Sequence, residues 1–489
     1  MENYFKKFRN NTIGINHIFK SPFGEKKLIY TDWTASGRLY RPIEEFISNK
    51  LGPFLGNTHS ETTVTGTTMT EAYHLAKSII KKHVNADKDD VIICAGSGMT
   101  GVINKFQRIL GLRLHESFKS YVNISGADKP VIFISSMEHH SNQTSWLETI
   151  ADVEIIGLDN DGLTDLNHFE ELIKKYKDRK LKIAAITSCS NVTGVFTPYK
   201  EIARIIHSYE GYCFVDFAAS APYIEINMHP EKTGSHLDAV FFSPHKFLGG
   251  PGSSGVLIFN SKLYKNNVPD NPGGGTVEWT NPWGEHKFVD DIEAREDGGT
   301  PPFLQTIRAA LAIKLKEQMG IENIRKREDE ILHLVWNKLP EVPDIKILAD
   351  NIKNRLPIFS FYFENIHYNF MVRLLNDVYG IQSRGGCSCA GTYGHILLNV
   401  DFSKSKRITE KINLGDISIK PGWVRVSFHP TNTNEEIKFV INSISELAKD
   451  YEKYDKYYKR KPFSNDYDYI GENKSNFSEI AEIFNSCLE

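Results

Sequence analysis

The chain has 489 residues, 40% of them hydrophobic and 11% aromatic, and this length predicts two or three domains with buried cores. The composition excludes a disordered or collagen-like chain. Because 58 Lys and Arg residues face 61 Asp and Glu residues, giving a formal charge of -3, no overall basic field would attract nucleic acid or an anionic membrane.

The amino-terminal sequence, MENYFKKFRNNTIG, lacks the apolar run and cleavage site of a secretory signal, and no stretch of the chain is apolar over about eighteen residues. We therefore expect a soluble, cytoplasmic protein with no membrane segment. Six cysteines are too few for a disulfide framework in a chain of this length. We expect most of them to be thiols, and the close pair Cys387 and Cys389 needs an explanation of its own.

From about residue 68 to residue 264, short apolar runs alternate with helical patterns, as in βαβ units with a mostly parallel sheet. The first clear helix is expected to follow Thr68, because Thr68 and Glu71 have the spacing of a capping box. Short buried strands are predicted at residues 91–94, 131–136, 153–158, 182–188, 212–216, 239–243 and 255–259. Pro198 and Gly211 bracket a predicted crossover helix. The fold class is therefore α/β.

A Pro- and Gly-rich loop comes next, and a long helical pattern then runs from about Phe303 to the basic stretch near Arg325. Beyond it, strand-like runs at 358–363 and 423–428 and a helical run at 369–380 predict a smaller second α/β unit. The predicted division of the chain has four parts: an N-terminal segment over residues 1–35 that packs with the small domain, a large domain over 36–325, a small domain over 326–450 that carries the Cys387/Cys389 loop, and a C-terminal extension over 451–489.

Polar residues follow several of the predicted strands, and ligands of open α/β sheets gather at the carboxyl ends of strands. The small residues 95–100 open a helix whose free N–H groups would favour a phosphate, although an ordinary tight turn has the same pattern. His139 could stack on a flat ring or carry a proton, or it could be structural. Asn191 could hold a ring substituent, or simply form a turn.

The two remaining positions carry charge. Asp216 ends a strongly apolar strand, where an acid needs a partner such as a cationic ring nitrogen; capping a helix is the alternative role. Lys246 directly follows another buried strand and precedes glycines that permit close backbone approach. Such an amine suits a Schiff base, whereas most lysines are merely solvated. Together, these five features are the contacts that pyridoxal phosphate needs.

The ordered segments GSGMT, MEHH, SNVTG, VDFA, SPHK, GGGT, GGTP, RGGCSCAG and RVSFHPTNT, within residues 28 to 450, resemble the cysteine desulfurase and selenocysteine lyase group of class V aminotransferase-fold enzymes. The resemblance implies the pyridoxal-phosphate-dependent transferase fold (fold type I), with helices on both faces of a mostly parallel sheet and a smaller α/β C-terminal domain. It also implies a homodimer with shared active sites, a cysteine or selenocysteine substrate, and a sulfur-acceptor protein as a further partner.

Position by position, the resemblance implies that Lys246 forms the Schiff base with pyridoxal 5'-phosphate, Asp216 pairs with the pyridinium nitrogen and His139 stacks on the ring. The remaining cofactor contacts implied are Gly98, Met99, Thr100, Asn191, Ser243, His245 and, from a neighbouring subunit, Thr276. Ala35 and His59 lie in segments similar to those that line the family's substrate pocket.

The second domain supplies the feature that selects a reaction. Cys389 stands five residues after Arg384, as does the nucleophilic Cys of the desulfurases, and Arg425 matches the Arg that clamps the substrate carboxylate. The implied reaction removes sulfur from cysteine as a persulfide on Cys389 and releases alanine, with Lys246 removing the α-proton and His139 a candidate proton carrier. A Cys-x-Cys metal pair would need two more ligands, and only His395 is near, so no metal is expected.

Two departures leave the substrate open. Ala219 stands where desulfurases usually carry a Gln, and Cys387 and Ser388 precede Cys389 where one desulfurase branch has two His. The loop is also similar to that of the desulfurase-like domain of molybdenum cofactor sulfurases, although a full sulfurase would need a further domain for which we expect this chain to be too short. The alternatives are another class V reaction, such as an aminotransferase, epimerase or kynureninase-like lyase, and a cofactor-free scaffold of the same fold.

Overall fold

The apolar runs of the first half of the chain form one seven-stranded sheet. In the computed structural model, which describes residues 1–58, 62–471 and 476–486, the strand order is β4-β10-β9-β8-β7-β5-β6. The strands are β4 (Asp90–Ala95), β5 (Val131–Ser135), β6 (Asp152–Ile156), β7 (Lys182–Thr187), β8 (Tyr212–Asp216), β9 (Ala239–Phe242) and β10 (Gly255–Asn260). Only β10 pairs antiparallel with its neighbours; the pairs among β5 to β9 are parallel. The predicted α/β class and mostly parallel sheet are confirmed.

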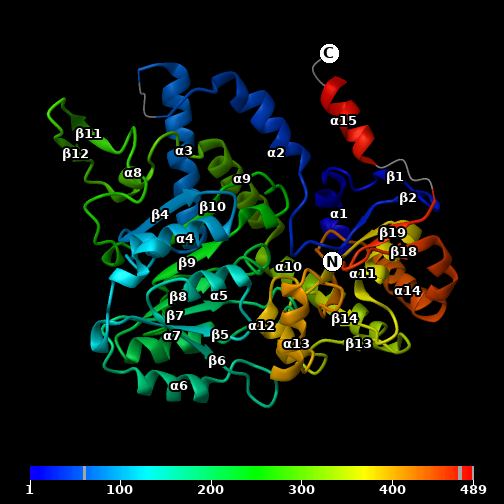
Figure 1. Cartoon of the computed structure of the whole chain (residues 1–489). Helices are drawn as coiled ribbons and strands as arrows, with labels where there is room; N and C mark the ends of the chain where they lie inside the picture. Colours follow the sequence, from blue (N-terminus) through cyan, green and yellow to red (C-terminus); the bar gives the residue numbers. More distant parts are fainter. Residues whose placement is uncertain (59–61, 472–475, 487–489) are drawn as a thin grey trace.

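Alternate side chains of these strands face two layers of helices (Figure 1). Ile92 and Cys94 of β4 pack in one apolar cluster, and Val91 and Ile93 in another. The first layer contains α3 (Val64–His83), α6 (Leu166–Lys175), α7 (Tyr199–Ser208) and α9 (Phe303–Met319), and the second contains α4 (Met99–Ile109) and α5 (His140–Leu147). Because both faces are covered, the strands are apolar on both faces.

Two helix boundaries differ from the sequence-based expectation. The helix α3 begins at Val64 rather than after Thr68, because the Thr63 hydroxyl accepts a hydrogen bond from the Gly66 N–H at 3.2 Å and caps it there. The long pattern from Phe303 is two helices, α9 and α10 (Ile321–Trp336). They are separated by Gly320, whose φ of 76° is left-handed and ends the first helix. The crossover helix α7 lies where it is predicted.

The second half of the chain builds a smaller antiparallel sheet with the order β13-β14-β17-β16. Its strands are β13 (Lys346–Ile347), β14 (Ile358–Tyr362), β16 (Arg384–Gly386) and β17 (Trp423–Ser427). Side chains of α10, α11 (Tyr368–Tyr379) and α14 (Asn434–Asp450) share one apolar core with it. The predicted smaller α/β unit is therefore confirmed.

The amino-terminal segment joins this smaller unit, because β3 (Ile29–Tyr30) pairs in parallel with β15 (Ile381–Gln382). Towards the carboxyl end of the chain, residue Tyr458 contacts the smaller unit in the same way: its hydroxyl donates to Asp377 of α11 at 2.7 Å. The helix α10 spans the predicted boundary between residues 325 and 326, and the division into domains stays a prediction.

The remaining α-helices and strands are α1 (Glu2–Asn10), β1 (Ile18–Ser21), β2 (Gly24–Lys27), α2 (Arg41–Phe46), β11 (Val277–Thr280), β12 (His286–Phe288), α8 (Ile292–Glu296), α12 (Gly391–Leu397), α13 (Phe402–Asn413), β18 (Tyr458–Arg460), β19 (Tyr467–Tyr469) and α15 (Asn476–Ser486). Among the described residues, none of the helices combines the length and apolar character needed to span a bilayer.

Candidate active site

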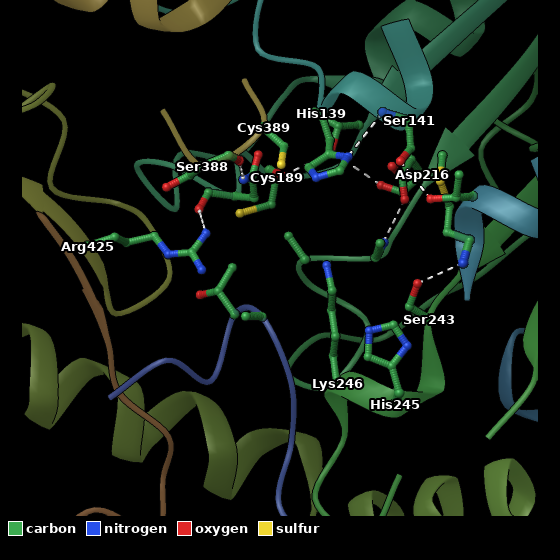
Figure 2. A pocket seen from close by; sticks show the side chains of 18 of the residues that line it. His139, Ser141, Cys189, Asp216, Ser243, His245, Lys246, Ser388, Cys389 and Arg425 are labelled. Atoms are coloured by element: carbon green, nitrogen blue, oxygen red, sulfur yellow. Dashed lines mark hydrogen bonds between the residues drawn. The ribbon is translucent and has the colours of Figure 1, made fainter. Parts of the chain in front are cut away.

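A cavity of about 240 Å³ lies at the carboxyl ends of the central strands, where the loop after β16 and the amino-terminal segment close over it (Figure 2). We call it the central pocket. Twelve of the residues predicted from the sequence line it: Ala35, Met99, Thr100, His139, Asn191, Asp216, Ser243, His245, Lys246, Arg384, Cys389 and Arg425. Segments more than 350 residues apart in the sequence therefore meet in one place.

Two predicted residues of the described chain do not line this pocket. Gly98 lies just behind its wall, where a Cβ would sit 3.0 Å from His245 Cε1 and 3.1 Å from Ser243 Oγ. Thr276 is buried in its own loop and donates its hydroxyl to the Gly273 carbonyl at 2.7 Å. His59 lies outside the described residues.

Lys246 projects into the pocket from the short turn that follows β9 (Figure 2). The turn is tight enough that a Cβ at Gly250 would lie 1.8 Å from the Pro244 carbonyl oxygen, which explains a glycine there. Burial lowers the pKa of Lys246 to about 8, and the Asp216 carboxylate opposes this shift. The amine is thus partly neutral near neutral pH.

Asp216 ends β8 and is 2% exposed. Burial raises its pKa to about 6, against the Ala218 N–H, which donates to Oδ1 at 2.8 Å, and against the charge of Lys246. A carboxylate held in this way is stabilised further by any cation brought next to it.

His139 both caps α5 and lines the pocket. The Ser141 N–H donates to its Nδ1 at 3.1 Å, so the ring proton lies on Nε2. Burial lowers the pKa of His139 to about 3, and the charge of Lys246 acts in the same direction. The ring is therefore neutral at physiological pH.

Two hydrogen bonds to its carbonyl groups hold the loop that carries Cys389 against residues of the central-sheet part of the chain. The His140 N–H donates to the Cys389 carbonyl at 2.7 Å, and the Asn191 side-chain amide donates to the Ser388 carbonyl at 2.7 Å. Ser388 and Cys389 both have left-handed backbone angles, with φ of 50° and 57°, which is costly for residues other than glycine. Cys389 is exposed, so its thiol is accessible.

Sequence reasoning assigned no role to Asp32, which pairs with both arginines of the site. Arg425 donates to Asp32 Oδ1 at 2.8 Å and to the Asn191 carbonyl at 2.9 Å, whereas Arg384 reaches Asp32 Oδ2 at 3.0 Å. Within the described chain, Arg425 Nε has no hydrogen-bond partner although it is buried. Asp32 lies two residues after the two-residue strand β3, which is too short an apolar run to give a local signal.

The pocket has further lining residues that sequence reasoning missed. The Ser141 hydroxyl lies 2.7 Å from the Thr100 hydroxyl, oxygen to oxygen, so Ser141 adds a hydroxyl beside the predicted Thr100. Its signal is its place in the first turn of a helix that follows a strand. Cys189 also lines the pocket, and its buried thiol donates to the Gly194 carbonyl at 3.1 Å. Burial raises the pKa of Cys189, which keeps this thiol protonated.

Comparison with known proteins gives relatives of similar sequence. A probable cysteine desulfurase of Halalkalibacterium halodurans is 28% identical over 367 residues, which cover 74% of this chain and 84% of that protein. A cysteine desulfurase of Haloferax volcanii is 27% identical over 319 residues, covering 64% of this chain and 67% of that protein.

Solved structures have the same fold. The apo structure of a cysteine desulfurase from Thermococcus onnurineus superposes with a TM-score of 0.71 at 23% identity, covering 91% of this chain and 98% of that one. A cysteine desulfurase from Escherichia coli gives a TM-score of 0.67 at 23% identity with the same coverage. The family model for class-V aminotransferases matches residues 29–440. Because this match takes in both the central sheet and the loop that carries Cys389, the chain belongs to the class-V aminotransferase family.

Proposed function

We propose that this protein is a pyridoxal-phosphate-dependent cysteine desulfurase, which transfers the sulfur of L-cysteine to Cys389 as a persulfide and releases alanine. The observation that carries the proposal is that an accessible thiol, Cys389, and an amine of lowered pKa, Lys246, line the same pocket. The relatives named as cysteine desulfurases, at 28% and 27% identity, support the same reaction.

The residues present fit pyridoxal 5'-phosphate. At one end of the pocket, the start of α4 and the side chains of Thr100, Ser243 and His245 would hold the phosphate. Gly98 fits this role because a side chain there would press on Ser243 and His245. Deeper in the pocket, Asn191 Oδ1 is buried and has no hydrogen-bond partner among the described residues, which leaves an acceptor for a ring hydroxyl.

When bound, pyridoxal phosphate supplies an aldehyde that links to an amine and a ring that accepts electrons from the substrate Cα. Asp216 would pair with the ring nitrogen, where a positive charge keeps its buried carboxylate ionised. His139 would stack on the ring as a neutral imidazole. Its lowered pKa of about 3 favours this stacking role over a proton-carrying one.

The other residues act on the amino acid. Lys246 would take the proton from the substrate Cα, because an amine with a pKa of about 8 is partly neutral at physiological pH. Arg425 would bind the substrate carboxylate, with Asp32 fixing the direction of its guanidinium group. The Cys389 thiolate would then attack the substrate sulfur: the sulfur–sulfur bond forms on Cys389 as the carbon–sulfur bond of the substrate breaks.

The assembly and the finer substrate choice belong to the same proposal. We infer a homodimer in which Thr276 serves the site of the partner subunit, and a separate protein that accepts the sulfur from Cys389. Cysteine is the proposed substrate, with selenocysteine as the alternative of the same chemistry.

The test is to incubate the purified holoenzyme with L-cysteine, quantify alanine and sulfide, and locate the persulfide by peptide mass. We expect alanine in step with sulfur release and an added sulfur on Cys389. Amino-group transfer without a persulfide would instead indicate another class-V reaction. Protein without a yellow absorbance that borohydride bleaches would indicate a cofactor-free scaffold.

A further inference from the structure

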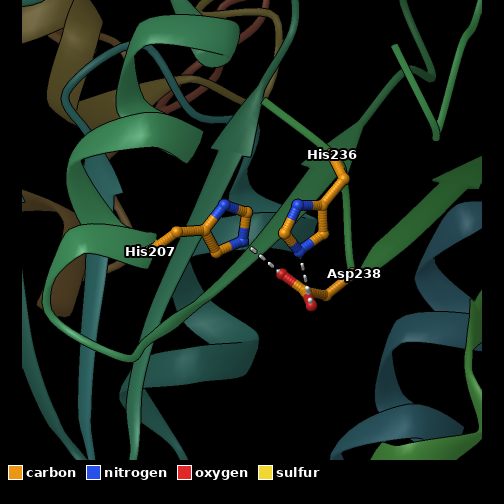
Figure 3. Close-up of side chains that lie close together, drawn as sticks. All are labelled: His207, His236 and Asp238. Carbon is orange, nitrogen blue, oxygen red and sulfur yellow. Dashed lines mark hydrogen bonds and ion pairs between the residues drawn. The ribbon is translucent and has the colours of Figure 1, made fainter. Parts of the chain in front are cut away.

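A second cluster of titratable side chains, drawn in Figure 3, lies at the amino-terminal end of the central strand β9. It consists of His207 in the last turn of α7, His236, and Asp238, which directly precedes β9. We call it the His-His-Asp cluster. The central pocket lies at the carboxyl end of β9, and this cluster lies at its amino end, so the two are separate sites.

The three side chains converge on one point. His207 Nε2 lies 2.8 Å from Asp238 Oδ2, and His236 Nε2 lies 3.8 Å from Asp238 Oδ1. The two imidazole rings are stacked with centroids 3.9 Å apart and planes 5° apart. One possible ligand atom from each residue therefore falls within a sphere small enough for a single ion, because these atoms all lie within 4.8 Å of one another.

Neighbouring backbone groups fix the orientation of the cluster. His207 Nδ1 lies 2.7 Å from the Gly234 carbonyl oxygen, which can only accept, so Nδ1 carries the proton and Nε2 is left to bind. The Cys213 N–H donates to Asp238 Oδ2 at 2.8 Å. Histidines that bind a metal usually donate their other ring N–H to a carbonyl or carboxylate, and carboxylates that bind a metal are usually hydrogen-bonded as well.

A metal ion can take the place of protons in this arrangement. Each Nε2 faces a carboxylate oxygen, so each would have to carry a proton to be attracted to it. Because its Nδ1 also donates to the Gly234 carbonyl, His207 would then be an imidazolium, stacked on the His236 ring with centroids 3.9 Å apart. One divalent cation in place of the two protons contacts both nitrogens and the carboxylate while both rings stay neutral.

We propose that the His-His-Asp cluster binds one divalent transition-metal ion of the zinc class. Two imidazoles and one carboxylate suit such an ion and leave a position for water. Metal–ligand bonds of about 2.0–2.2 Å let a single ion span both the 2.8 Å and the 3.8 Å separations. His236 is 48% exposed at its side chain, so its ring has room to turn toward the ion.

The bound ion would fasten α7 to the segment that leads into β9, and therefore to the strand that ends near Lys246. This is a structural role that does not depend on which reaction the central pocket performs. It predicts that zinc raises the stability of the folded protein, because an ion that binds only the native state shifts the unfolding equilibrium.

In the described part of the chain, two other places could take up zinc and must be separated from this one. The thiols Cys387 and Cys389 are accessible enough to bind soft metals. A neighbouring cluster contains Asp87, Asp90 and His229, with His229 Nε2 2.6 Å from Asp90 Oδ2.

The experiment therefore uses the full-length, cofactor-loaded protein with Cys387→Ser and Cys389→Ser as the parent. Zinc chloride is titrated into it by calorimetry in a buffer that does not chelate metals. We expect one equivalent to bind. His236→Gln should weaken binding by at least about tenfold, whereas the matched variant His229→Gln should bind as the parent does. Because His236 is half exposed, its replacement should leave the circular dichroism and the zinc-free melting temperature unchanged.

A melting experiment gives a second readout. Zinc should raise the melting temperature of the parent and of His229→Gln, and leave that of His236→Gln unchanged. The proposal is overturned if the parent shows no saturable zinc binding, if His236→Gln binds as tightly as the parent, or if His229→Gln is the variant that loses the ion.

Discussion

Cys389 differs from the other cysteines of the described chain in being exposed. Cys94, Cys189 and Cys213 are buried, and burial raises the pKa of each, which disfavours the thiolate. Cys389→Ala should therefore abolish persulfide formation and alanine release while the cofactor absorbance persists, as measured by peptide mass and amino acid analysis. Cys387→Ala is the matched control and should still form the persulfide on Cys389. Undiminished turnover in Cys389→Ala would reject the assigned nucleophile.

Arg425 offers a planar fork of donors: Asp32 and the Asn191 carbonyl each accept from one terminal nitrogen, and Nε has no partner in the described chain. Arg425→Lys keeps the charge but loses two-point binding of a carboxylate, so we expect KM for cysteine to rise at least about tenfold with a smaller change in kcat. Steady-state kinetics measure both. Binding of cysteamine, which lacks the carboxylate, is the control and should change little. An equal loss for cysteamine would mean that the variant disturbs the pocket generally.

Lys246 must be neutral to react with an aldehyde, and its pKa of about 8 sets the pH at which it becomes so. The rate at which cofactor-free protein captures pyridoxal phosphate should rise with pH and level off above about 8, well below the range of an ordinary lysine. Absorbance after rapid mixing follows the capture. Because Asp216 raises the pKa of Lys246, Asp216→Asn should move the midpoint to lower pH. A midpoint near that of free lysine would contradict the burial argument.

At the scale of the element, the segment after β16 is held in a strained backbone conformation by contacts with α5. The Gly391 N–H donates to His140 Nε2 at 2.9 Å, next to the bond between the His140 N–H and the Cys389 carbonyl. His140→Ala removes the first contact. We expect a loss of roughly tenfold in the rate of persulfide formation, with unchanged cofactor absorbance. His395→Ala is the control, because His395 contacts the Gly391 carbonyl from the side of α12 and does not line the pocket. Equal losses in both variants would argue against positioning by His140.

The sequence predicts best those elements whose pattern lies within a few neighbouring residues. Each central strand is an apolar run, and the residues that follow these runs share one edge of the sheet, so Asp216 and Lys246 could be expected to meet. Asp32 could not be found in this way, because its partner Arg425 is 393 positions away in the sequence. The wrong start predicted for α3 has another cause: Thr63 and Thr68 are both residue types that cap helices, and the helix uses Thr63.

At the scale of the whole molecule, the central pocket is assembled from three parts of the chain. The sheet supplies Lys246 and Asp216, the smaller unit supplies Cys389 and Arg425, and the amino-terminal segment supplies Asp32, which is bonded to the arginines of the smaller unit. Because the charged groups come from different parts, folding and the site depend on the same buried contacts. The dependence of the unfolding free energy on pH reports on such buried titratable groups together.

In the described chain, partial or full burial lowers the pKa of His83, His139 and His429 to about 3 and that of His367 to about 4. A base whose pKa is lower in the folded state takes up its proton first in the unfolded state. Their contribution to stability is therefore lost as pH falls below about 6.5 and toward 3 to 4. Asp216, whose pKa is raised to about 6, acts in the opposite sense and relieves its own burial cost as pH falls.

The effect of a single histidine can be tested at His429, which is 2% exposed and stacked on Trp33 with ring centroids 4.2 Å apart. In cofactor-free protein, His429→Gln should reduce the slope of unfolding free energy against pH by up to one proton, about 1.4 kcal/mol per pH unit, between pH 6 and 4.5. Urea unfolding at a series of pH values measures this slope. Trp33→Phe removes packing but no titrating group, so it should lower stability equally at every pH. An unchanged slope in His429→Gln would show that this ring takes up its proton in the folded state as readily as in the unfolded one.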